Sequence, residues 1–485
     1  MIAADDEPSC ASLREAQRLL GEGELKAALE PAWRALRAAP ASRAAKSLIA
    51  KLLQRVPVRA GDVDEDDLLR LMRDPDVDPA QIANAGWQFL LGAGPPASAG
   101  AAALAAWLED SALARALLEE TYVAWPDAER LLTGIRRWLL VEGIWPDFPG
   151  LAAALAAQAR HNKGAWPFDP VEEARLRDAG AFRLAYLSGP CEPPIESGAN
   201  PVARQYETWP YPPWSRVTIP APTTLPRMVE RLDPGGPDLP AEADMLIAGC
   251  GTGREAAMAA LRYPDARVTA IDVSGPSLEH ARAGCLDLPI DFHRLDLRDV
   301  RRLGKHFDAI FCSGVLHHLP DPEAGWRTLA GVLKPGGVMR VRLYSRLGRL
   351  KIAAAKRMIA DLAAGPEDDS LLRAIRRRLL DEAPGLLADI RDFYTLAGVH
   401  DLLLNRHEDA FDIPRIRRAL DGLGLRLIAM GFPVAAAEAQ YRREHPQDPR
   451  LRDLAAIAAF EQRHPFLFRS MYDIWCRKPG GAQPA

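Results

Sequence analysis

Three glycines at alternate positions form the most conspicuous ligand-binding pattern in this sequence. The segment DMLIAGCGTGREA reads as a buried strand, then the loop Gly249-Cys250-Gly251-Thr252-Gly253, then a helix. Glycines let the backbone pass against a ligand with no Cβ in the way, and a helix N-terminus favours a negatively charged group. Because Gly251, Gly253 and Ala256 also fit the pattern G-x-G-x-x-G/A, a dinucleotide-binding loop is one interpretation.

Acidic residues are predicted at the ends of the next two strands. Asp272 lies nineteen residues beyond Gly253, where a carboxylate can accept both ribose hydroxyls of an adenosine ligand. Asp296 ends the third strand, from which a short acidic side chain could accept an adenine amino group, with Asp299 as its competitor. An adenosine-containing cofactor fits both positions.

The segment FDAIFCSGVLHHLPDPEAGWRTLAGVLKPGGVMRV decides between the possible cofactors. Here the chain resembles the class I S-adenosylmethionine-dependent methyltransferases, in which a strand before "hLHH", an acidic-proline turn, a helix and "LKPGG" lead into the fifth strand. The matching residues are Phe307, Asp308, Val315, Leu316, His317, His318, Leu319, Asp321, Pro322, Leu333, Lys334, Pro335, Gly336 and Gly337.

The resemblance implies S-adenosylmethionine as the cofactor and transfer of its methyl group to an acceptor that the sequence does not identify. The residues expected to hold the cofactor are Gly249, Cys250, Gly251, Thr252, Gly253, Asp272, Val273, Asp296, Leu297, Ser313, Gly314 and Tyr206. A nicotinamide oxidoreductase using the same glycine loop is a rival, against which LKPGG and a late antiparallel strand count. A catalytically silent interaction protein is the other rival.

Short apolar strands alternating with helical stretches predict the α/β sheet that must position these residues. We expect a Rossmann-like, seven-stranded methyltransferase sheet in a domain at 225–485. The predicted strands are 244–250, 267–273, 290–296, 307–314, 337–345, 425–432 and 470–479. The last of them corresponds to the family's antiparallel seventh strand.

Residues 1–165 are rich in alanine and leucine at helical spacing and predict an all-α domain. Within it, Ala28, Ala32, Ala35 and Pro40 are spaced as in the second helix of a tetratricopeptide repeat, although the 34-residue period does not continue. A generic helical bundle is the alternative. The whole layout resembles a bacterial subgroup of methyltransferases with helical repeats at the N-terminus, and we expect this domain to bind a protein or peptide acceptor.

Residues 166–224 are expected to form a linker that ends in an aromatic and proline-rich segment, ARQYETWPYPPWSR. The tyrosine- and proline-rich segment in front of the core in the same subgroup is similar. Its rings offer flat surfaces that could cover the cofactor or pack between domains; they are Tyr206, Trp209, Tyr211 and Trp214.

Residues 346–412 are longer than a simple crossover, and we expect them to form a helical lid that builds specificity. Arg373, Arg376, Arg377 and Arg378 in it predict a solvated helix face rather than an anion site. The candidates for a general base or a substrate-binding group are Tyr394, His400 and His407 in the lid, and His317 and His318 after the fourth strand. Methyl transfer needs no metal, and none is expected.

Composition limits the class of protein, its partners and its location. Hydrophobic residues make up 48% and charged residues 26%, as in globular proteins, and a formal net charge of −4 argues against nucleic acid as a partner. The longest apolar stretch is too short to span a bilayer, so no membrane association is expected. The six cysteines are scattered and read as free thiols, and with the acidic N-terminus they predict a cytoplasmic protein.

Overall fold

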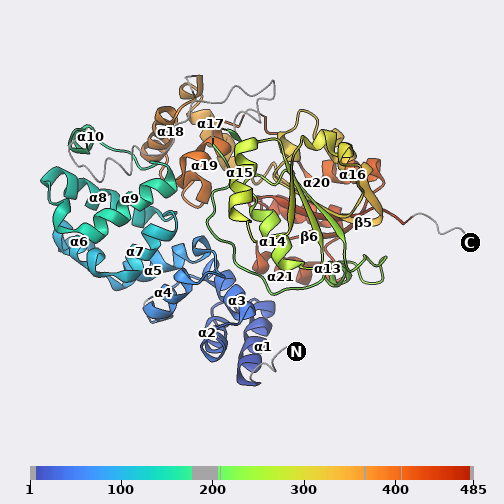
Figure 1. Cartoon of the computed structure of the whole chain (residues 1–485), viewed down its shortest axis with the longest axis horizontal. Helices are drawn as coiled ribbons and strands as arrows, with labels where there is room; N and C mark the ends of the chain where they lie inside the picture. Colours follow the sequence, from blue (N-terminus) through green and yellow to red (C-terminus); the bar gives the residue numbers. More distant parts are fainter. Residues whose placement is uncertain are drawn as a thin grey trace, which may run out of the picture. The chain divides into compact units, whose positions relative to one another are not determined.

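The computed structural model describes residues 7–59, 61–176, 206–207, 209–364, 367–405 and 407–480 (Figure 1). The chain divides into two compact units, which are described separately below. Unit 1 comprises Met1–Glu192, Ser215–Ile219 and Ala354–Leu404, and unit 2 comprises Pro193–Trp214, Pro220–Ala353 and Asn405–Ala485.

Unit 1 begins with α-helices, as its alanine- and leucine-rich sequence predicts. Ser42, Asp64 and Ser111 each accept a hydrogen bond from a backbone N–H of the first turn that follows, which fixes where three of the helices begin. The helices are α1 (Glu7–Glu22), α2 (Leu29–Ala38), α3 (Arg43–Leu53), α4 (Glu65–Arg73), α5 (Ala83–Ala93), α6 (Ala101–Asp110), α7 (Ala112–Glu120), α8 (Pro126–Glu142), α9 (Pro149–Asn162) and α10 (Pro170–Leu176), with short 3-10 turns between them. Trp33, Trp87 and Trp166 are buried in their shared core.

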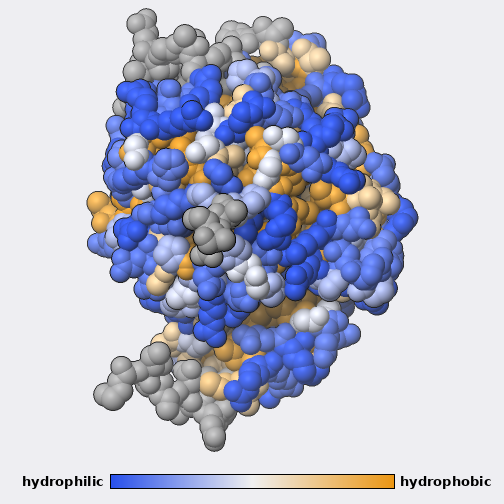
Figure 2. Space-filling model, turned by 90° about the vertical axis from the view of Figure 1, so that its right-hand side faces the viewer, coloured by the Kyte–Doolittle hydropathy of each residue, from blue (hydrophilic) through white to orange (hydrophobic). Residues whose placement is uncertain are grey.

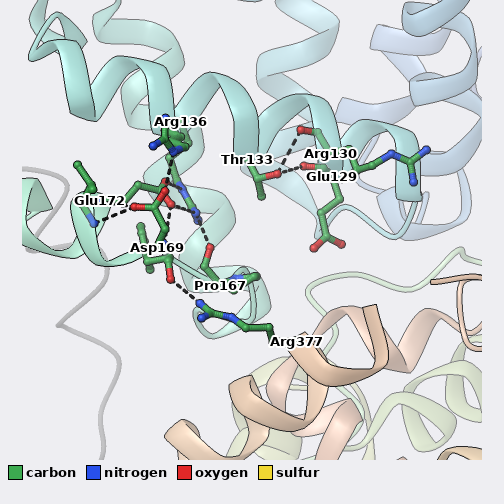
Figure 3. A network of polar contacts seen from close by, with 11 residues as sticks. Glu129, Arg130, Thr133, Arg136, Pro167, Asp169, Glu172 and Arg377 are labelled. Carbon is green, nitrogen blue, oxygen red and sulfur yellow. Dashed lines mark hydrogen bonds and ion pairs between the residues drawn. The ribbon is translucent and has the colours of Figure 1, made fainter. Parts of the chain in front are cut away.

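A buried ion pair joins α8 to α10 within unit 1 (Figure 3). The Arg136 Nε lies 3.0 Å from Glu172 Oε1, both side chains are almost fully buried, and Arg136 also donates to the Pro167 carbonyl at 2.6 Å. Its guanidinium carbon stands 3.9 Å from the centre of the Phe168 ring. A buried charge needs this full set of partners, because an unpaired one would be costly.

The expected lid divides between the two units. Of residues 346–412, Ala354–Leu404 cluster with the N-terminal helices in unit 1. They form the C-terminal part of α17 (Leu350–Met358), together with α18 (Asp369–Glu382) and α19 (Leu396–Leu403). Only the two ends of the segment, 346–353 and 405–412, belong to unit 2.

The arginines of α18 explain this division. Arg376 is fully buried and donates to Glu129 of α8 at 2.6 Å and to the Phe393 carbonyl at 2.9 Å. Arg373 donates to the Gly164 carbonyl at 2.9 Å. The predicted solvated face is therefore wrong for Arg376, whose carboxylate partner is distant in the sequence.

Unit 2 is built on one seven-stranded sheet in the order β3-β2-β1-β4-β5-β7-β6. The strands are β1 (Asp244–Ala248), β2 (Arg267–Asp272), β3 (Ile290–Arg294), β4 (Phe307–Ser313), β5 (Leu333–Leu343), β6 (Arg426–Gly431) and β7 (Tyr472–Arg477). β7 is antiparallel to both of its neighbours, and the other pairings are parallel. The predicted Rossmann-like methyltransferase sheet is confirmed, and β5 begins earlier than expected because Leu333 pairs with Phe307.

Helices cover both faces of the sheet (Figure 1). Residues alternate along β1, so that Met245 and Ile247 join one apolar cluster and Leu246 and Ala248 join the other. The first cluster includes residues of α13 (Leu225–Leu232), α14 (Arg254–Arg262) and α15 (Gly275–Gly284). The second includes residues of α16 (Pro322–Val332), α20 (Ile413–Leu423), α21 (Ala435–Glu444) and α22 (Leu454–Arg463).

The strand order reverses between β1 and β4, and ligands of such sheets bind outside the carboxyl ends of the strands at that point. On the face of the molecule shown in Figure 2, hydrophilic residues predominate and hydrophobic residues appear in areas between them. Among the described residues, no helix has the length and apolar character needed to cross a membrane.

Candidate functional site

The glycine loop lies at the carboxyl end of β1, and the protein's own packing requires its glycines. Gly249, Gly251 and Gly253 all have positive φ, at 74°, 52° and 90°. A Cβ at Gly249 would lie 2.4 Å from Val315, one at Gly251 would lie 2.7 Å from the Tyr211 carbonyl oxygen, and one at Gly253 would lie 2.7 Å from the Ala281 Cβ. The glycines thus let three other segments approach the loop.

Asp272 lies beside this loop, as the sequence spacing predicts. Its Oδ2 accepts a hydrogen bond from the Gly251 N–H at 2.7 Å, and its Oδ1 accepts from the Ser274 N–H at 2.9 Å. Burial raises the pKa of the Asp272 carboxyl above its usual range, although both N–H groups lower it. The carboxylate oxygens keep further lone pairs with which to accept hydroxyl groups.

The aromatic segment packs on the glycine loop. Trp214 donates from Nε1 to the Thr252 carbonyl at 2.8 Å, and Thr252 Oγ1 donates to the Pro212 carbonyl at 2.5 Å. The Ser274 hydroxyl donates to the Tyr206 carbonyl at 3.2 Å. Backbone and side chains of 206–207 and 209–214 therefore pack on the glycine loop and the end of β2 within unit 2.

The second predicted acid is engaged by a neighbouring arginine. Asp296 caps the 3-10 helix Leu297–Leu303 by accepting from the Arg298 N–H, and the Arg298 guanidinium binds both of its oxygens, at 3.0 and 2.6 Å. Burial raises the pKa of Asp296, but the bonds from Arg298 outweigh it and hold that pKa below the usual range. Asp299, the competitor, is exposed.

The remaining predicted cofactor-binding residues have different environments. Cys250 is buried, and burial raises the pKa of its thiol well above the usual value. The Val273 carbonyl accepts from Arg294 at 3.2 Å, and the Leu297 side chain is buried in the core. Ser313, at the end of β4, donates to Glu255 at 2.9 Å, and its neighbour Gly314 has a φ of 75°.

His317, His318 and His407 come together in unit 2, close to the carboxyl end of β4. The two adjacent imidazole rings lie 4.3 Å apart, and His318 Nδ1 lies 2.8 Å from the His407 carbonyl. His317 is fully buried and accepts a hydrogen bond from the Tyr344 backbone N–H at 3.2 Å. Its imidazole also stacks on the Tyr344 ring, with the ring centres 3.9 Å apart. Burial lowers the pKa of His317 well below its usual value, so this imidazole stays neutral.

Tyr394 and His400 belong to unit 1. The Tyr394 hydroxyl donates to the Ala388 carbonyl at 2.9 Å, and His400 Nε2 lies 3.4 Å from a Glu367 oxygen. Both side chains are buried within that unit. The five candidates for a base or substrate-binding group are therefore divided between the two units.

A group of charged residues on β5, β7 and α14 escaped the sequence analysis. Arg340 and Arg342 of β5 lie on the same face of the sheet as Asp473 of β7, and Glu255 belongs to the first turn of α14. The alternation of arginine with apolar residues in MRVRL (339–343) was the available signal, since alternate residues of a strand share a face. Within the described residues, no cluster of three or more histidine, cysteine, aspartate or glutamate side chains is arranged to hold a metal ion.

Comparison with known proteins agrees with this geometry. Residues 245–337 match the family model described as a methyltransferase domain, a range that runs from β1 into β5 and includes the glycine loop and Asp272. The chain contains a class I methyltransferase domain. S-adenosylmethionine is the cofactor of this family of domains.

Curated relatives match part of this chain. An uncharacterised protein of Synechococcus sp. is 36% identical over 202 residues, which are 38% of this chain and 47% of that protein. The ubiquinone biosynthesis O-methyltransferase of Chromobacterium violaceum is 38% identical over 96 residues, covering 19% of this chain and 40% of the enzyme. The chain thus spans about half or less of the length of these curated relatives.

A solved structure, PKMT2 from Rickettsia typhi in complex with AdoHcy, is also similar. It shares 16% sequence identity, covers 55% of each chain and has a TM-score of 0.37.

Proposed function

We propose that this protein transfers a methyl group from S-adenosylmethionine to an acceptor molecule. The observation that carries the proposal is the contact between the glycine loop and the acid at the end of β2, where Gly251 N–H donates to Asp272 at 2.7 Å. That contact lies at the carboxyl ends of the strands where the sheet order reverses, the usual ligand position in such sheets. The match to the methyltransferase domain family supports the same assignment.

The residues of the loop region fit this cofactor. Asp272 offers a charged acceptor to the two ribose hydroxyls, and the Gly249–Gly253 backbone passes beside it. The Trp214 ring and the Tyr206 backbone lie beside the loop region and support it. Asp296 can also bind the cofactor once its bonds to Arg298 rearrange. The other proposed cofactor-binding residues are Val273, Leu297, Ser313 and Gly314.

The cofactor supplies a methyl group that its sulfonium already activates. The chain's own task is therefore to align the acceptor atom and to exclude water. His317 is a poor base because a buried, neutral imidazole with a lowered pKa does not hold a proton near neutral pH. His318 and His407 remain the candidates in unit 2 for orienting the acceptor.

For the acceptor, we propose a protein, a peptide or a small molecule. The helical unit supports a protein or peptide, because stacked helix pairs present concave surfaces, and α1 and α2 pack against each other. The relatives include a trans-aconitate 2-methyltransferase of Deinococcus radiodurans, 36% identical over 101 residues, which supports a small molecule. A cytoplasmic location, where the free thiols of the described cysteines stay reduced, belongs to the same proposal.

The test has two steps on the full chain. Calorimetric titration with S-adenosylhomocysteine measures binding, and the Asp272→Asn variant is the control for the site. Incubation with methyl-labelled S-adenosylmethionine and cell lysate, followed by separation of proteins, nucleic acids and small molecules, then identifies the labelled class. Absence of binding by the wild-type protein would refute the cofactor, and binding without any labelled product would indicate a silent interaction protein.

A further inference from the structure

Two rows of residues run across the sheet at the carboxyl ends of β4 and β5. In the pairing register, Phe311, Arg340 and Trp475 form one row. The next row, nearer the end of β4, consists of Ser313, Arg342 and Asp473. Side chains of paired residues project to the same face, so two arginines share one small area.

Arg340 is neutralised within the protein. It binds both oxygens of Asp473, at 2.8 and 2.6 Å, and its Nη1 lies 3.8 Å from Glu255. Its guanidinium carbon also stands 5.3 Å from the centre of the Trp475 ring. This geometry is that of a complete structural ion pair with an aromatic contact.

Arg342 is not neutralised in this way. Its Nε is buried and has no hydrogen-bond partner, and among the described residues no carboxylate lies within ion-pair distance of it. Asp473 is occupied by Arg340, and Glu255 accepts the Ser313 hydroxyl at 2.9 Å. The residue as a whole is only half-buried.

The charges around Arg342 indicate which kind of ligand group would pair with its guanidinium. Burial lowers the pKa of Arg342, and the neighbouring charges of Arg340 and Arg254 add to this, while Asp473 and Glu255 oppose it. Asp473 is already bound by Arg340, so the charge of Arg342 has no ion-pair partner of its own among the described residues. A partly desolvated charge of this kind is costly unless it is paired, and a single negative charge restores the balance. A planar carboxylate matches the fork of a guanidinium better than a compact anion does.

The position of the group connects it with methyl transfer. Glu255 lies two residues after Gly253, the last residue of the glycine loop, and Ser313 is followed directly by Gly314 at the end of β4. We propose that Arg342 binds a carboxylate group of a ligand in the methyl-transfer site. The proposal rests on the proposed function, and the carboxylate belongs either to the amino-acid end of the cofactor or to the acceptor.

The experiment compares the wild-type full chain with Arg342→Gln, Arg342→Lys and the control Arg417→Gln, which removes an exposed positive charge of α20. Calorimetry measures the affinity for S-adenosylhomocysteine and for 5′-methylthioadenosine, which lacks the amino acid and its carboxylate. Thermal unfolding of the S-adenosylhomocysteine complex with added sodium acetate, against sodium chloride at equal ionic strength, probes an acceptor carboxylate. Unfolding of the ligand-free variants reports any purely structural role.

If the cofactor supplies the carboxylate, Arg342→Gln loses about tenfold or more in affinity for S-adenosylhomocysteine, because a charge-assisted bidentate contact is removed. Its affinity for 5′-methylthioadenosine is unchanged, and Arg342→Lys recovers part of the loss. If the acceptor supplies it, acetate stabilises the wild-type complex and not that of Arg342→Gln. In both cases the ligand-free Arg342→Gln protein is at least as stable as wild type, because an uncompensated charge has been removed.

Equal behaviour of Arg342→Gln and wild type in both arms would overturn the proposal. So would a loss of affinity for both nucleosides together with a lower melting temperature, since that result indicates only a structural role. Failure of the wild-type protein to bind either nucleoside would instead refute the proposed function, and the two failures are therefore distinguishable.

Discussion

Replacing Asp272 with asparagine tests the core of the proposed cofactor site. The carboxylate has two oxygens that accept from the Gly251 and Ser274 N–H groups at 2.7 and 2.9 Å. The amide keeps the volume but has one oxygen, so its NH₂ group must face one of these N–H donors. It also loses the charge that the ribose hydroxyls are expected to meet.

The expected loss of affinity follows from these contacts. Hydrogen bonds to a charged group contribute about 1.5 to 3 kcal/mol each, and the asparagine retains part of one. We expect binding of S-adenosylhomocysteine to weaken by about 2 to 4 kcal/mol, which is about 30- to 1000-fold in Kd. The loss of stability should be smaller, because burial already disfavours the charged carboxylate in the free protein.

Calorimetry on the folded full-length variant measures this change, and thermal unfolding shows whether the protein remains intact. Asp299→Asn is the matched control, because Asp299 is an exposed acid close to the end of the next strand. An affinity of Asp272→Asn within about threefold of wild type, which is under about 1 kcal/mol, would refute the role of Asp272 as the ribose acceptor.

Three further expectations follow from the same contacts. Affinity for S-adenosylhomocysteine should fall as the pH is lowered through the raised pKa of Asp272, which calorimetry across pH measures. The contribution of this carboxyl to the free energy of unfolding has the opposite trend. It is present at low pH and is lost as the pH rises through that pKa, because the native state holds the proton more tightly. Gly251→Ala places a Cβ 2.7 Å from the Tyr211 carbonyl oxygen at a φ of 52°, so both melting temperature and cofactor affinity should decrease. Arg376→Met leaves Glu129 buried without its partner and should lower the free energy of unfolding by about 3 to 5 kcal/mol, measured by urea denaturation.

Matched variants serve as controls for Gly251→Ala and Arg376→Met. Gly422→Ala, in α20 with open space around its Cβ position, should be neutral or slightly stabilising, by up to about 1 kcal/mol. Arg378→Met removes an exposed pair with Asp361 and should change stability much less than Arg376→Met does. If Gly251→Ala matched Gly422→Ala, or Arg376→Met matched Arg378→Met, the packing argument at that position would be wrong.

Local patterns determined the elements that carry the cofactor site. Apolar runs separated by helical stretches predict the seven strands, because a parallel sheet buried on both faces needs continuous apolar strands. The glycine loop and Asp272 could be placed together because the carboxyl ends of neighbouring parallel strands meet at one edge of the sheet. Nothing in that reasoning requires knowledge of residues distant in the sequence.

The reason for the glycines came only from the tertiary structure. The sequence predicts them as a passage for the ligand, whereas Val315, Tyr211 and Ala281 occupy the positions beside their missing Cβ atoms. These three residues lie in different segments of the chain, and a pattern of neighbouring residues cannot report which segments approach a loop.

The placement of Ala354–Leu404 was likewise decided by contacts between distant residues. The sequence places this segment in a lid on the methyltransferase domain, and the predicted linker at 166–224 would separate it from the N-terminal helices. The structure buries Arg376 against Glu129, 247 residues away in the chain, and so groups the segment with those helices. A charged side chain in a helix reads as solvent-exposed in the sequence, and only its folded partner makes burial energetically acceptable.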